Sequence, residues 1–306
     1  MSSLDTSPWV VTIMGDDLDQ APWAEELKRH GADELELREL RRGKPTVVEG
    51  RCSLAEPMDT AALRAALQRR LPDADVAIQR DHVFRQRKRL VVFDMDSTLI
   101  QVEVIDELAR LHGIEEQVSD ITRRAMEGEL DYEASLHERV ALLRGLDSLT
   151  AQNIATRLPL SEGAAATVRA LKRLGIKTAV VSGGFTFAAH VLRERLGLDY
   201  AFANELEVVA HRLTGRVMGE VVTPQRKASL LRVMAQVDGL SLDQVCAVGD
   251  GANDLMMLAA AGLGVAFHGK PTVAAAADTS IGSGSLLQLL YLFGLSQREI
   301  DELLAD

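Results

Sequence analysis

Cysteine is scarce in this chain of 306 residues, and its scarcity excludes two kinds of chemistry. Cys52 and Cys246 are the only cysteines, and they lie far apart in the sequence. Neither belongs to a closely spaced group of the kind that binds zinc or forms a redox motif. Thiols used so sparingly are typical of a reducing compartment, so we expect two buried, reduced thiols and a cytoplasmic protein.

Basic charge and long apolar runs are also lacking. Lysine and arginine together number 34 against 45 aspartates and glutamates, which gives a formal net charge of -11. A field of that sign repels polyanions, so we expect no nucleic-acid partner and no membrane binding. No apolar run approaches the roughly 20 residues that cross a bilayer, and the first residues lack the basic and apolar regions of a secretory signal. Any anion site in this chain must therefore be local.

The first 82 residues predict a small α+β domain. Their hydrophobic pattern predicts the order strand, helix, strand, strand, helix, strand, at residues 9–14, 21–31, 34–40, 46–53, 58–71 and 75–80. This order is typical of a ferredoxin-like domain, in which helices cover one face of an antiparallel sheet. The polar and basic residues 81–89 are interpreted as a solvated connector.

Residues 88–306 predict a second, larger α/β domain with a Rossmann-like parallel sheet. Apolar runs at residues 90–94, 178–182, 245–250 and 263–267 are typical of strands that are buried on both faces. Residues from about 102 to 160 are helical in pattern and far exceed what a crossover requires, so we expect a helical cap over the carboxyl edge of the sheet. Residues 206–220 predict a β-hairpin with Gly215 in its turn.

Two carboxylates follow the first of these buried strands. Asp94 and Asp96 stand at positions i and i+2 of VVFDMDSTLI, so both side chains point to the same side of an extended chain. Two like charges converge favourably only where a cation or a shared proton relieves their repulsion. An ordinary turn after a strand also favours Asp, Ser and Thr, so this motif alone leaves both interpretations open.

Two further strands end in residues that suit a phosphate and a metal ion. Ser182 offers a hydroxyl, and Gly183 and the glycine after it let backbone amides approach an oxyanion, although a strand-to-helix turn would also explain the glycines. Asp250 ends another strand and is followed by Asn253 and Asp254. With the first two aspartates these residues form a set of hard oxygen ligands that suits Mg²⁺ rather than zinc. Capping of the next helix is the alternative, and Asp254 is expected to orient ligands rather than touch the metal.

A lysine completes this group of motifs. Thr223 and Pro224 suit the N-cap and first position of a helix, which places Lys227 in or near its first turn. A cation there opposes the helix dipole unless an anion shares the site. A solvated surface lysine is the alternative, and it loses weight once the other motifs are counted.

The combined residue types predict phosphoryl transfer. Asp94 would attack phosphorus and form an aspartyl-phosphate. Asp96 would protonate the leaving alkoxide and then deprotonate the hydrolytic water. Mg²⁺, Lys227 and Ser182 would neutralise the phosphoryl oxygens as charge spreads over them in the transition state.

The motifs DMDST, SGG, a lysine opening a helix, and GDGAND occur in this order, and together they resemble the haloacid dehalogenase superfamily of phosphohydrolases. Residues 88 to about 290 resemble, more closely, its phosphoserine phosphatase family. The resemblance implies that Asp94 is the nucleophile, and that Asp96 is the acid and base and also offers a backbone carbonyl to Mg²⁺. It implies that Asp250 is the third protein ligand of the metal.

The same resemblance implies how the substrate is bound. Ser182, Gly183, Lys227 and Asn253 would surround the phosphate. In the helical cap, Glu103 would bind the amino group of phosphoserine and Arg139 its carboxyl group, because a guanidinium fork suits a carboxylate. Without the resemblance, each of the two would be interpreted as a solvated charge on a helix.

The N-terminal domain resembles the ACT type of small regulatory domain, which implies serine as an effector. Its first strand-to-helix loop, MGDDLDQAPW at residues 14–23, lacks the glycine-rich turn usual where such domains bind amino acids. Docking or formation of a homodimer therefore remains the alternative role for this domain.

The expected activity is hydrolysis of phosphoserine to serine and phosphate, the last step of serine biosynthesis. One alternative is a phosphotransferase that passes the phosphoryl group to another hydroxyl acceptor such as homoserine. The other alternative is a non-catalytic amino-acid sensor, against which the complete set of charged motif residues argues.

Overall fold

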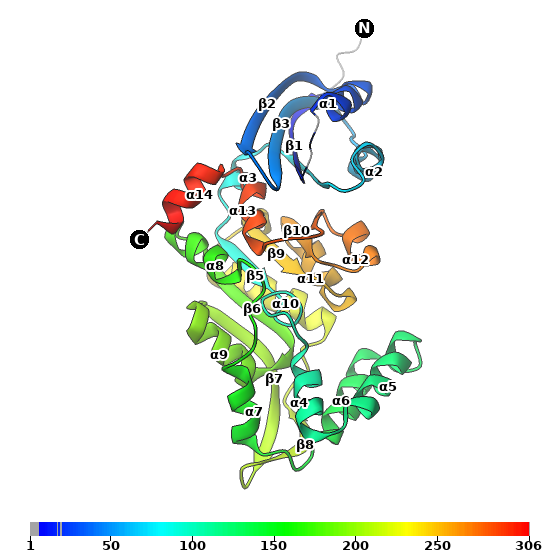
Figure 1. The fold of residues 1–306 in the computed structure, drawn as a ribbon, viewed down its shortest axis with the longest axis vertical. Helices are drawn as coiled ribbons and strands as arrows, with labels where there is room; N and C mark the ends of the chain where they lie inside the picture. The colour runs from blue at the N-terminus through cyan, green and yellow to red at the C-terminus, as the bar shows by residue number, and fades with distance from the viewer. Residues whose placement is uncertain (1–5, 17, 19, 306) are drawn as a thin grey trace.

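The computed structural model describes residues 6–305 apart from 17 and 19, and it is elongated, with two units stacked along its long axis (Figure 1). The N-terminal unit is a four-stranded sheet in the order β2-β3-β1-β4, with antiparallel pairing throughout. Its elements are β1 (Thr6–Gly15), α1 (Gln20–Arg29), β2 (Asp33–Arg41), β3 (Thr46–Ala55), α2 (Thr60–Arg70) and β4 (Asp75–Arg80). The predicted order of strands and helices is confirmed. Asp17 and Asp19, in the loop without a glycine-rich turn, lie outside the described residues.

The N-terminal sheet is buried on both faces, for two different reasons. Trp9, Val11 and Ile13 alternate along β1 and pack under α1 and α2 in a core of their own. On the other face, Met14 and Val47 belong to the core of the C-terminal unit. The sheet therefore lies between its own helices and the second unit.

Residues 81–89, which link the two units, were interpreted as a solvated connector, and this interpretation is wrong for two of their charged side chains. Within this segment, the short helix α3 (Val83–Gln86) carries Arg85, which is 1% exposed and forms an ion pair with the fully buried Glu49 of β3. Lys88 is 3% exposed and donates to the carbonyl of Asp243 at 2.7 Å. Composition did not reveal this burial, because the partners are distant in sequence.

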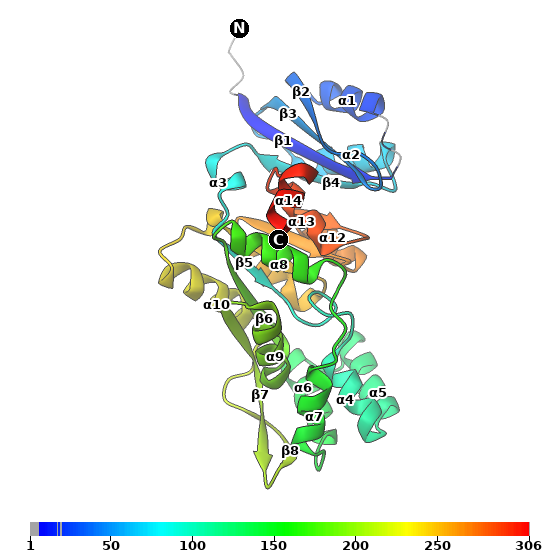
Figure 2. The same ribbon diagram turned by 60° about the vertical axis from the view of Figure 1, so that its left-hand side comes forward.

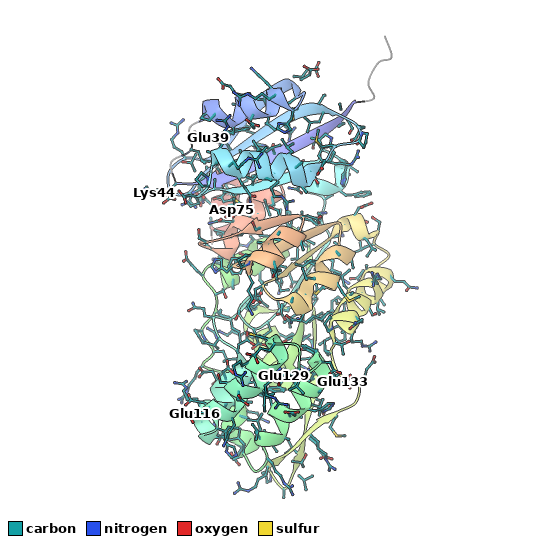
Figure 3. The ribbon with its side chains drawn as sticks, turned by 90° about the vertical axis from the view of Figure 1, so that its right-hand side faces the viewer. Glu39, Lys44, Asp75, Glu116, Glu129 and Glu133 are labelled. Atoms are coloured by element: carbon teal, nitrogen blue, oxygen red, sulfur yellow. The ribbon has the colours of Figure 1, made fainter. Side chains whose placement is uncertain are left out.

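The edges of the two sheets meet at the junction of the units. In Figure 3, Asp75 of β4 lies where the N-terminal unit faces the C-terminal one. Its carboxylate accepts from the backbone N–H of Gly282 at 2.9 Å, and the hydroxyl of Thr279 in β11 lies 3.4 Å from the carbonyl of Val76. Hydrogen bonds as well as apolar packing therefore join the two units.

The C-terminal unit has a seven-stranded sheet in the order β11-β10-β9-β5-β6-β7-β8, parallel except for β8 at one edge. The α/β fold class is confirmed, and the four predicted strands are β5, β6, β9 and β10. The strands are β5 (Leu90–Phe93), β6 (Lys177–Phe185), β7 (Tyr200–Val209), β8 (Arg212–Met218), β9 (Val245–Gly249), β10 (Leu263–Phe267) and β11 (Thr279–Ile281). The first half of β7 and the short β11 were not predicted.

Alternation along the central strand assigns the two faces of this sheet. Val91 and Phe93 point into one core, and Leu90 and Val92 point into the other. Helices α8 and α9 cover the first face, and α10 and α11 cover the second. The helices and 3₁₀ turns here are α8 (Ala164–Arg173), α9 (Thr186–Leu196), α10 (Pro224–Val237), η1 (Leu242–Gln244), η2 (Ala252–Asp254), α11 (Leu255–Ala260), α12 (Pro271–Ala276), η3 (Leu286–Gln288), α13 (Leu289–Leu292) and α14 (Gln297–Leu304).

Four helices follow β5 and form a helical layer at the end of the molecule opposite the N-terminal unit (Figures 1 and 2). They are α4 (Val104–His112), α5 (Glu115–Met126), α6 (Tyr132–Leu142) and α7 (Ser148–Ala155). Their helical character agrees with the pattern in the sequence. Within the described residues, no helix is both long and apolar enough to cross a membrane.

The hairpin formed by β7 and β8 turns at a different place from the one predicted. Its turn is made by Ala210 and His211, both with positive φ, between paired Val209 and Arg212. Gly215 lies inside β8 instead, with φ of +83°. A Cβ there would lie 2.9 Å from the carbonyl oxygen of Ala141 in α6, so this glycine permits close packing of the strand against the helical layer.

Candidate active site

Three adjacent parallel strands bring the predicted motifs to one edge of the sheet. Asp94 follows β5, Ser182 lies in the last part of β6, and Asp250 follows β9. These strands are neighbours in the order β9-β5-β6, so their carboxyl ends meet. This edge is where open parallel sheets bind ligands.

Lys227 lies between two of the carboxylates. Its Nζ donates to Asp94 Oδ1 at 2.6 Å and to Asp254 Oδ1 at 2.7 Å, and the lysine is fully buried. Thr223 caps α10 by accepting from the N–H of Arg226, which holds the lysine at the start of the helix. The cation near the positive end of the helix dipole is thus matched by two anions, and it is not a solvated surface lysine.

Burial and the charges of neighbouring groups act against each other on the pKa values of Lys227 and Asp94. Burial disfavours the charge of Lys227, but the carboxylates of Asp254 and Asp94 outweigh that effect and raise its pKa. Burial and the nearby charge of Asp254 raise the pKa of Asp94, against the lowering effect of Lys227. Lys227 therefore stays charged because it is hydrogen-bonded to two carboxylates, those of Asp94 and Asp254.

Asp96 is held by the backbone of the helical layer and by β6. Its Oδ1 accepts from the N–H of Val104 at 2.8 Å, and its Oδ2 accepts from the hydroxyl of Ser182 at 3.1 Å. The Ser182 hydroxyl in turn accepts from the N–H of Gly184 at 2.7 Å. Burial, followed by the charge of Glu103, raises the pKa of Asp96 to about 7. A carboxyl group with that pKa can both donate and accept a proton near neutral pH.

A cluster of carboxylates beside these residues could hold a metal ion. Ligand atoms of Asp94, Asp250 and Asp254 all lie within 4.8 Å of one another. Asp250 accepts from the hydroxyl of Thr98 at 3.1 Å, and burial raises its pKa to about 6. Asp254 also accepts from the N–H of Gly251 at 3.0 Å. Oxygen ligands of this kind suit a hard divalent cation.

The carboxylate of Asp96 is not part of this cluster, because its two oxygens are directed to Val104 and Ser182. Asn253 lies partly buried in the turn after Asp250, and its side chain makes no hydrogen bond with another described residue. Its amide therefore remains available to a ligand.

Glu103 and Arg139 reach the site from the helical layer. Glu103 occupies the N-cap position of α4 without capping it, and its Oε1 accepts from the hydroxyl of Ser97 at 2.9 Å. Arg139 of α6 donates through Nε to the carbonyl of Ser135 at 3.2 Å. Burial raises the pKa of Glu103, and the charge of Arg139 counteracts part of that rise. An anion and a cation from different helices are thus close enough to influence each other.

Three site residues were not identified from the sequence. Thr98 had a signal, because it belongs to the DMDST motif. Asn204 of β7 had none, yet it is 1% exposed and joins the end of β6 to the segment before α10. Its side chain donates to the carbonyl of Gly183 at 2.7 Å and accepts from the N–H of Val222 at 2.8 Å. Tyr132 of α6 lies against Gly183, a contact between residues 51 positions apart. Sequence spacing carries no information about contacts of this kind.

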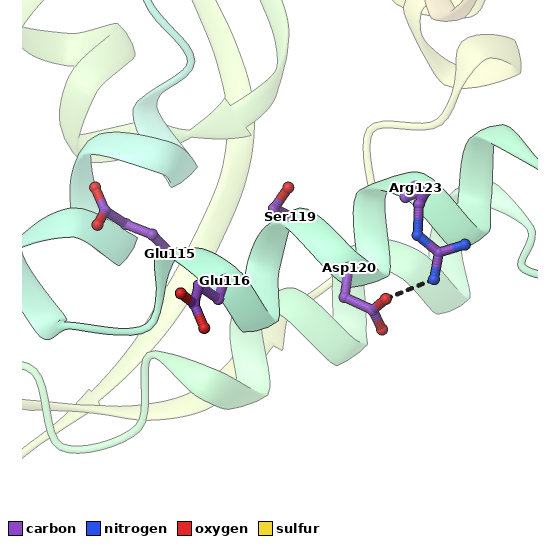
Figure 4. Close-up of a pocket in the computed structure, with 5 residues that line it drawn as sticks. All are labelled: Glu115, Glu116, Ser119, Asp120 and Arg123. Carbon is purple, nitrogen blue, oxygen red and sulfur yellow. Dashed lines mark hydrogen bonds and ion pairs between the residues drawn. The ribbon is translucent and has the colours of Figure 1, made fainter.

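A hollow on α5 lies elsewhere on the helical layer. Glu115, Glu116, Ser119, Asp120 and Arg123 line it, and their side chains project from one exposed face of the helix, with an Arg123 to Asp120 ion pair of 2.6 Å (Figure 4). It contains none of the predicted site residues.

Comparison with known proteins identifies the family. A model of the haloacid dehalogenase-like hydrolases matches residues 88–262. A phosphoserine phosphatase of Streptomyces coelicolor is 45% identical over 304 residues, which cover 97% of this chain and 73% of that protein.

Two solved structures are similar to this fold. A haloacid dehalogenase family hydrolase from Salmonella enterica serovar Typhi is 28% identical, with a TM-score of 0.81, covering 94% of this chain and 98% of that one. A phosphoserine phosphatase with a phospho-aspartyl intermediate analogue is 46% identical, with a TM-score of 0.63, covering 67% of this chain and 98% of that one. With the motif residues gathered at one sheet edge, these similarities place the chain among the haloacid dehalogenase-like hydrolases, in the family of the phosphoserine phosphatases.

Proposed function

We propose that this protein hydrolyses phosphoserine to serine and phosphate through a phosphorylated Asp94. The observation that carries the proposal is the buried bridge from Lys227 to Asp94 and Asp254 at the carboxyl edge of the sheet. It supports the proposal because the carboxylate that would act as the nucleophile lies beside a fixed cation, as attack on a phosphate dianion requires. A phosphoserine phosphatase with an analogue of a phospho-aspartyl intermediate is 46% identical to this chain, which supports the same route.

The chemistry of the chain takes two steps. An oxygen of Asp94 forms a bond to phosphorus while the bond from phosphorus to the serine oxygen breaks, and Asp96 gives its proton to that oxygen. Asp96 then takes a proton from water as the water oxygen attacks phosphorus, which releases phosphate and restores the Asp94 carboxylate. The pKa of about 7 suits Asp96 to both proton transfers.

Mg²⁺ fits the donor set of this site. Carboxylate oxygens of Asp94 and Asp250, with the backbone carbonyl of Asp96, would hold it, and Asp254 would orient them through Lys227 and Gly251. When bound, the ion would supply positive charge to the phosphoryl oxygens. Ser182, Gly183, Lys227 and Asn253 would hold the remaining phosphoryl oxygens.

Glu103 and Arg139 would give the site its preference for phosphoserine. Glu103 would accept from the ammonium group, and the guanidinium of Arg139 would bind the carboxylate, since only its Nε is engaged by Ser135. Two fixed charges of opposite sign match the two charged groups of a zwitterionic amino acid.

The proposed activity is accompanied by proposals for the domains, the metabolic role and the location of the protein. We propose an N-terminal ACT-like domain at residues 1–82, a phosphatase domain at 88–306 with its helical cap at about 102–160, and a place at the end of serine biosynthesis in the cytoplasm. Serine as an effector and a homodimer are roles proposed for the N-terminal domain. Transfer of the phosphoryl group to homoserine is the alternative reaction, and product analysis with and without that acceptor distinguishes it from hydrolysis.

The test of specificity compares three substrates on variants of the two charged residues. Arg139→Ala should lose about 2 to 5 kcal/mol of transition-state binding for phosphoserine, as when one side of a buried charge pair is removed, and far less for phosphoethanolamine, which has no carboxylate. Glu103→Gln should penalise phosphoserine and spare phosphoglycolate, which has no ammonium group.

Arg144→Ala is the matched control, because Arg144 is exposed near the end of the same helix. It should leave kcat/KM unchanged for all three substrates. Parallel losses on the three substrates for Arg139→Ala and Glu103→Gln would mean that these residues support closure of the helical layer, and the assignment would then be reduced to a phosphatase of small molecules.

A further inference from the structure

The phenol of Tyr132 lies where a side chain at Gly183 would be. A Cβ built on Gly183 would lie 1.8 Å from the Tyr132 hydroxyl and 3.2 Å from its Cζ. Gly183 has no positive φ, so it is this contact, and not backbone strain, that requires glycine. Residues 182–184 of β6 have no partner in the register with either neighbouring strand. The carbonyl of Gly183 is bonded to Asn204 and the N–H of Gly184 to Ser182, so the backbone group of this segment that would face a ligand is the N–H of Gly183.

The tyrosine is fixed in this position by the start of its helix. Tyr132 is the first residue of α6, and Asp131 caps the helix by accepting from the N–H of Ala134 at 2.7 Å. The ring packs against the main core of the C-terminal unit. A helix of the helical layer thus holds an aromatic side chain against the turn that follows the central part of β6.

The hydroxyl of Tyr132 is available as a donor. It makes no hydrogen bond with any residue that the structure describes, although Lys227, Asp94 and Arg139 are all close enough to influence its ionisation. Burial is the main reason that its pKa rises to about 12, so the phenol keeps its proton at any neutral pH. A protonated phenol that has no partner among the described residues, and that lies close enough to Lys227 and Asp94 for their charges to act on it, is well placed to donate to an anion.

We propose that the Tyr132 hydroxyl, seated against Gly183, donates a hydrogen bond to the phosphoryl group of the bound substrate. A phosphoryl oxygen that accepts a hydrogen bond from the N–H of Gly183 would lie about 2.9 Å from that nitrogen. It would be within reach of a phenol whose hydroxyl occupies the place of a Cβ on the same residue. The inference rests on the proposed phosphatase function and adds a phosphate contact from the helical layer. Glycine at position 183 then serves two purposes, exposure of its own N–H and space for the phenol.

The first test is Tyr132→Phe in the full chain with Mg²⁺. Loss of a hydrogen bond to a charged group should lower kcat/KM about 10-fold to 100-fold. The loss should be equal for phosphoserine, phosphoethanolamine and p-nitrophenyl phosphate, because the phosphoryl group is what they share, and inhibition by inorganic phosphate should weaken by about tenfold. Tyr200→Phe is the control, since its hydroxyl bonds Asp238 away from the site.

The second test is whether Tyr132→Phe rescues a variant at Gly183. Gly183→Ala should displace the phenol and fall below Tyr132→Phe in activity. In the double variant the hydroxyl is gone, and the ring atom nearest to the new Cβ is Cζ, at 3.2 Å, a contact that a small shift relieves. The activity of the double variant should therefore return to about that of Tyr132→Phe alone. Thermal unfolding of each variant checks that the fold is retained.

The outcomes separate this inference from the proposed function. A change of less than threefold in Tyr132→Phe on all substrates and on phosphate inhibition would overturn the hydrogen bond. Losses that multiply in the double variant would overturn the seating of the phenol against Gly183. If the wild type hydrolyses p-nitrophenyl phosphate with the expected dependence on Tyr132 but leaves phosphoserine intact, the substrate assignment fails and the tyrosine contact stands.

Discussion

Replacement of Lys227 by methionine should destabilise the protein strongly when no metal is present. The substitution keeps an unbranched side chain of similar length and removes the cation that lies 2.6 Å from Asp94 and 2.7 Å from Asp254. Both carboxylates are buried, at 4% and 0% exposure, so water cannot replace the lost charge. Two unpaired anions then remain next to each other in the core.

The expected loss is large because it arises from uncompensated charge. Removal of one partner from a buried ion pair costs about 3 to 5 kcal/mol. For a domain of about 200 residues, each kcal/mol changes Tm by about 2 to 4 °C, so Tm should fall by about 6 to 20 °C. The folded-state pKa of Asp94, already raised, should rise further, so the loss should be largest above that pKa and shrink as the pH falls and the carboxylates take up protons.

Thermal unfolding in EDTA near neutral pH measures this effect. Lys44→Met is the control, because Lys44 and its partner Asp16 are both exposed, and an exposed pair contributes about 0 to 1 kcal/mol. Addition of Mg²⁺ should raise the Tm of Lys227→Met by more than it raises the Tm of the wild type. The reason is that a divalent cation can neutralise the two carboxylates in place of the lysine. A variant that unfolds within 2 °C of the wild type in EDTA would refute the reasoning.

Three further changes test other parts of the molecule. Asp94→Asn should abolish turnover and retain the fold, since it removes the proposed nucleophile and preserves shape; steady-state kinetics with activity near wild type would disprove the covalent route. Asp96→Asn should lower kcat/KM more for phosphoserine than for p-nitrophenyl phosphate, whose leaving group needs no proton, and equal losses would argue against the role as acid. Burial raises the folded-state pKa of Asp75 from 3.8 to about 6, so ionised Asp75 costs stability above that pH. Asp75→Asn should therefore gain up to about 1 to 2 kcal/mol over the wild type as the pH rises from about 4 to 6, after discounting for partial exposure; a difference in Tm that is the same at pH 4.5 and pH 8 would contradict this.

Local patterns in the sequence predicted most of the helices and strands and assigned several candidate site residues to the ends of neighbouring strands. The apolar run before Asp94 predicted β5 because a strand buried on both faces needs apolar residues at every position. Thr223 predicted the N-cap that opens α10, since its hydrogen bond from the N–H of Arg226 spans only three residues. Asp94, Ser182 and Asp250 could be assigned to one edge because parallel strands all end on the same side of a sheet.

The tertiary structure alone decided which charges are buried and what they contact. Arg85 and Lys88 belong to a polar stretch whose composition predicted a solvated connector, and only the docking of the N-terminal sheet buries Arg85 against Glu49. The pairing of Lys227 with Asp94 joins residues 133 positions apart, and no local spacing encodes it. Composition and periodicity report a residue's own preference for water or for a helix or strand, whereas the free energy of a buried charge depends on the partner that the fold places beside it.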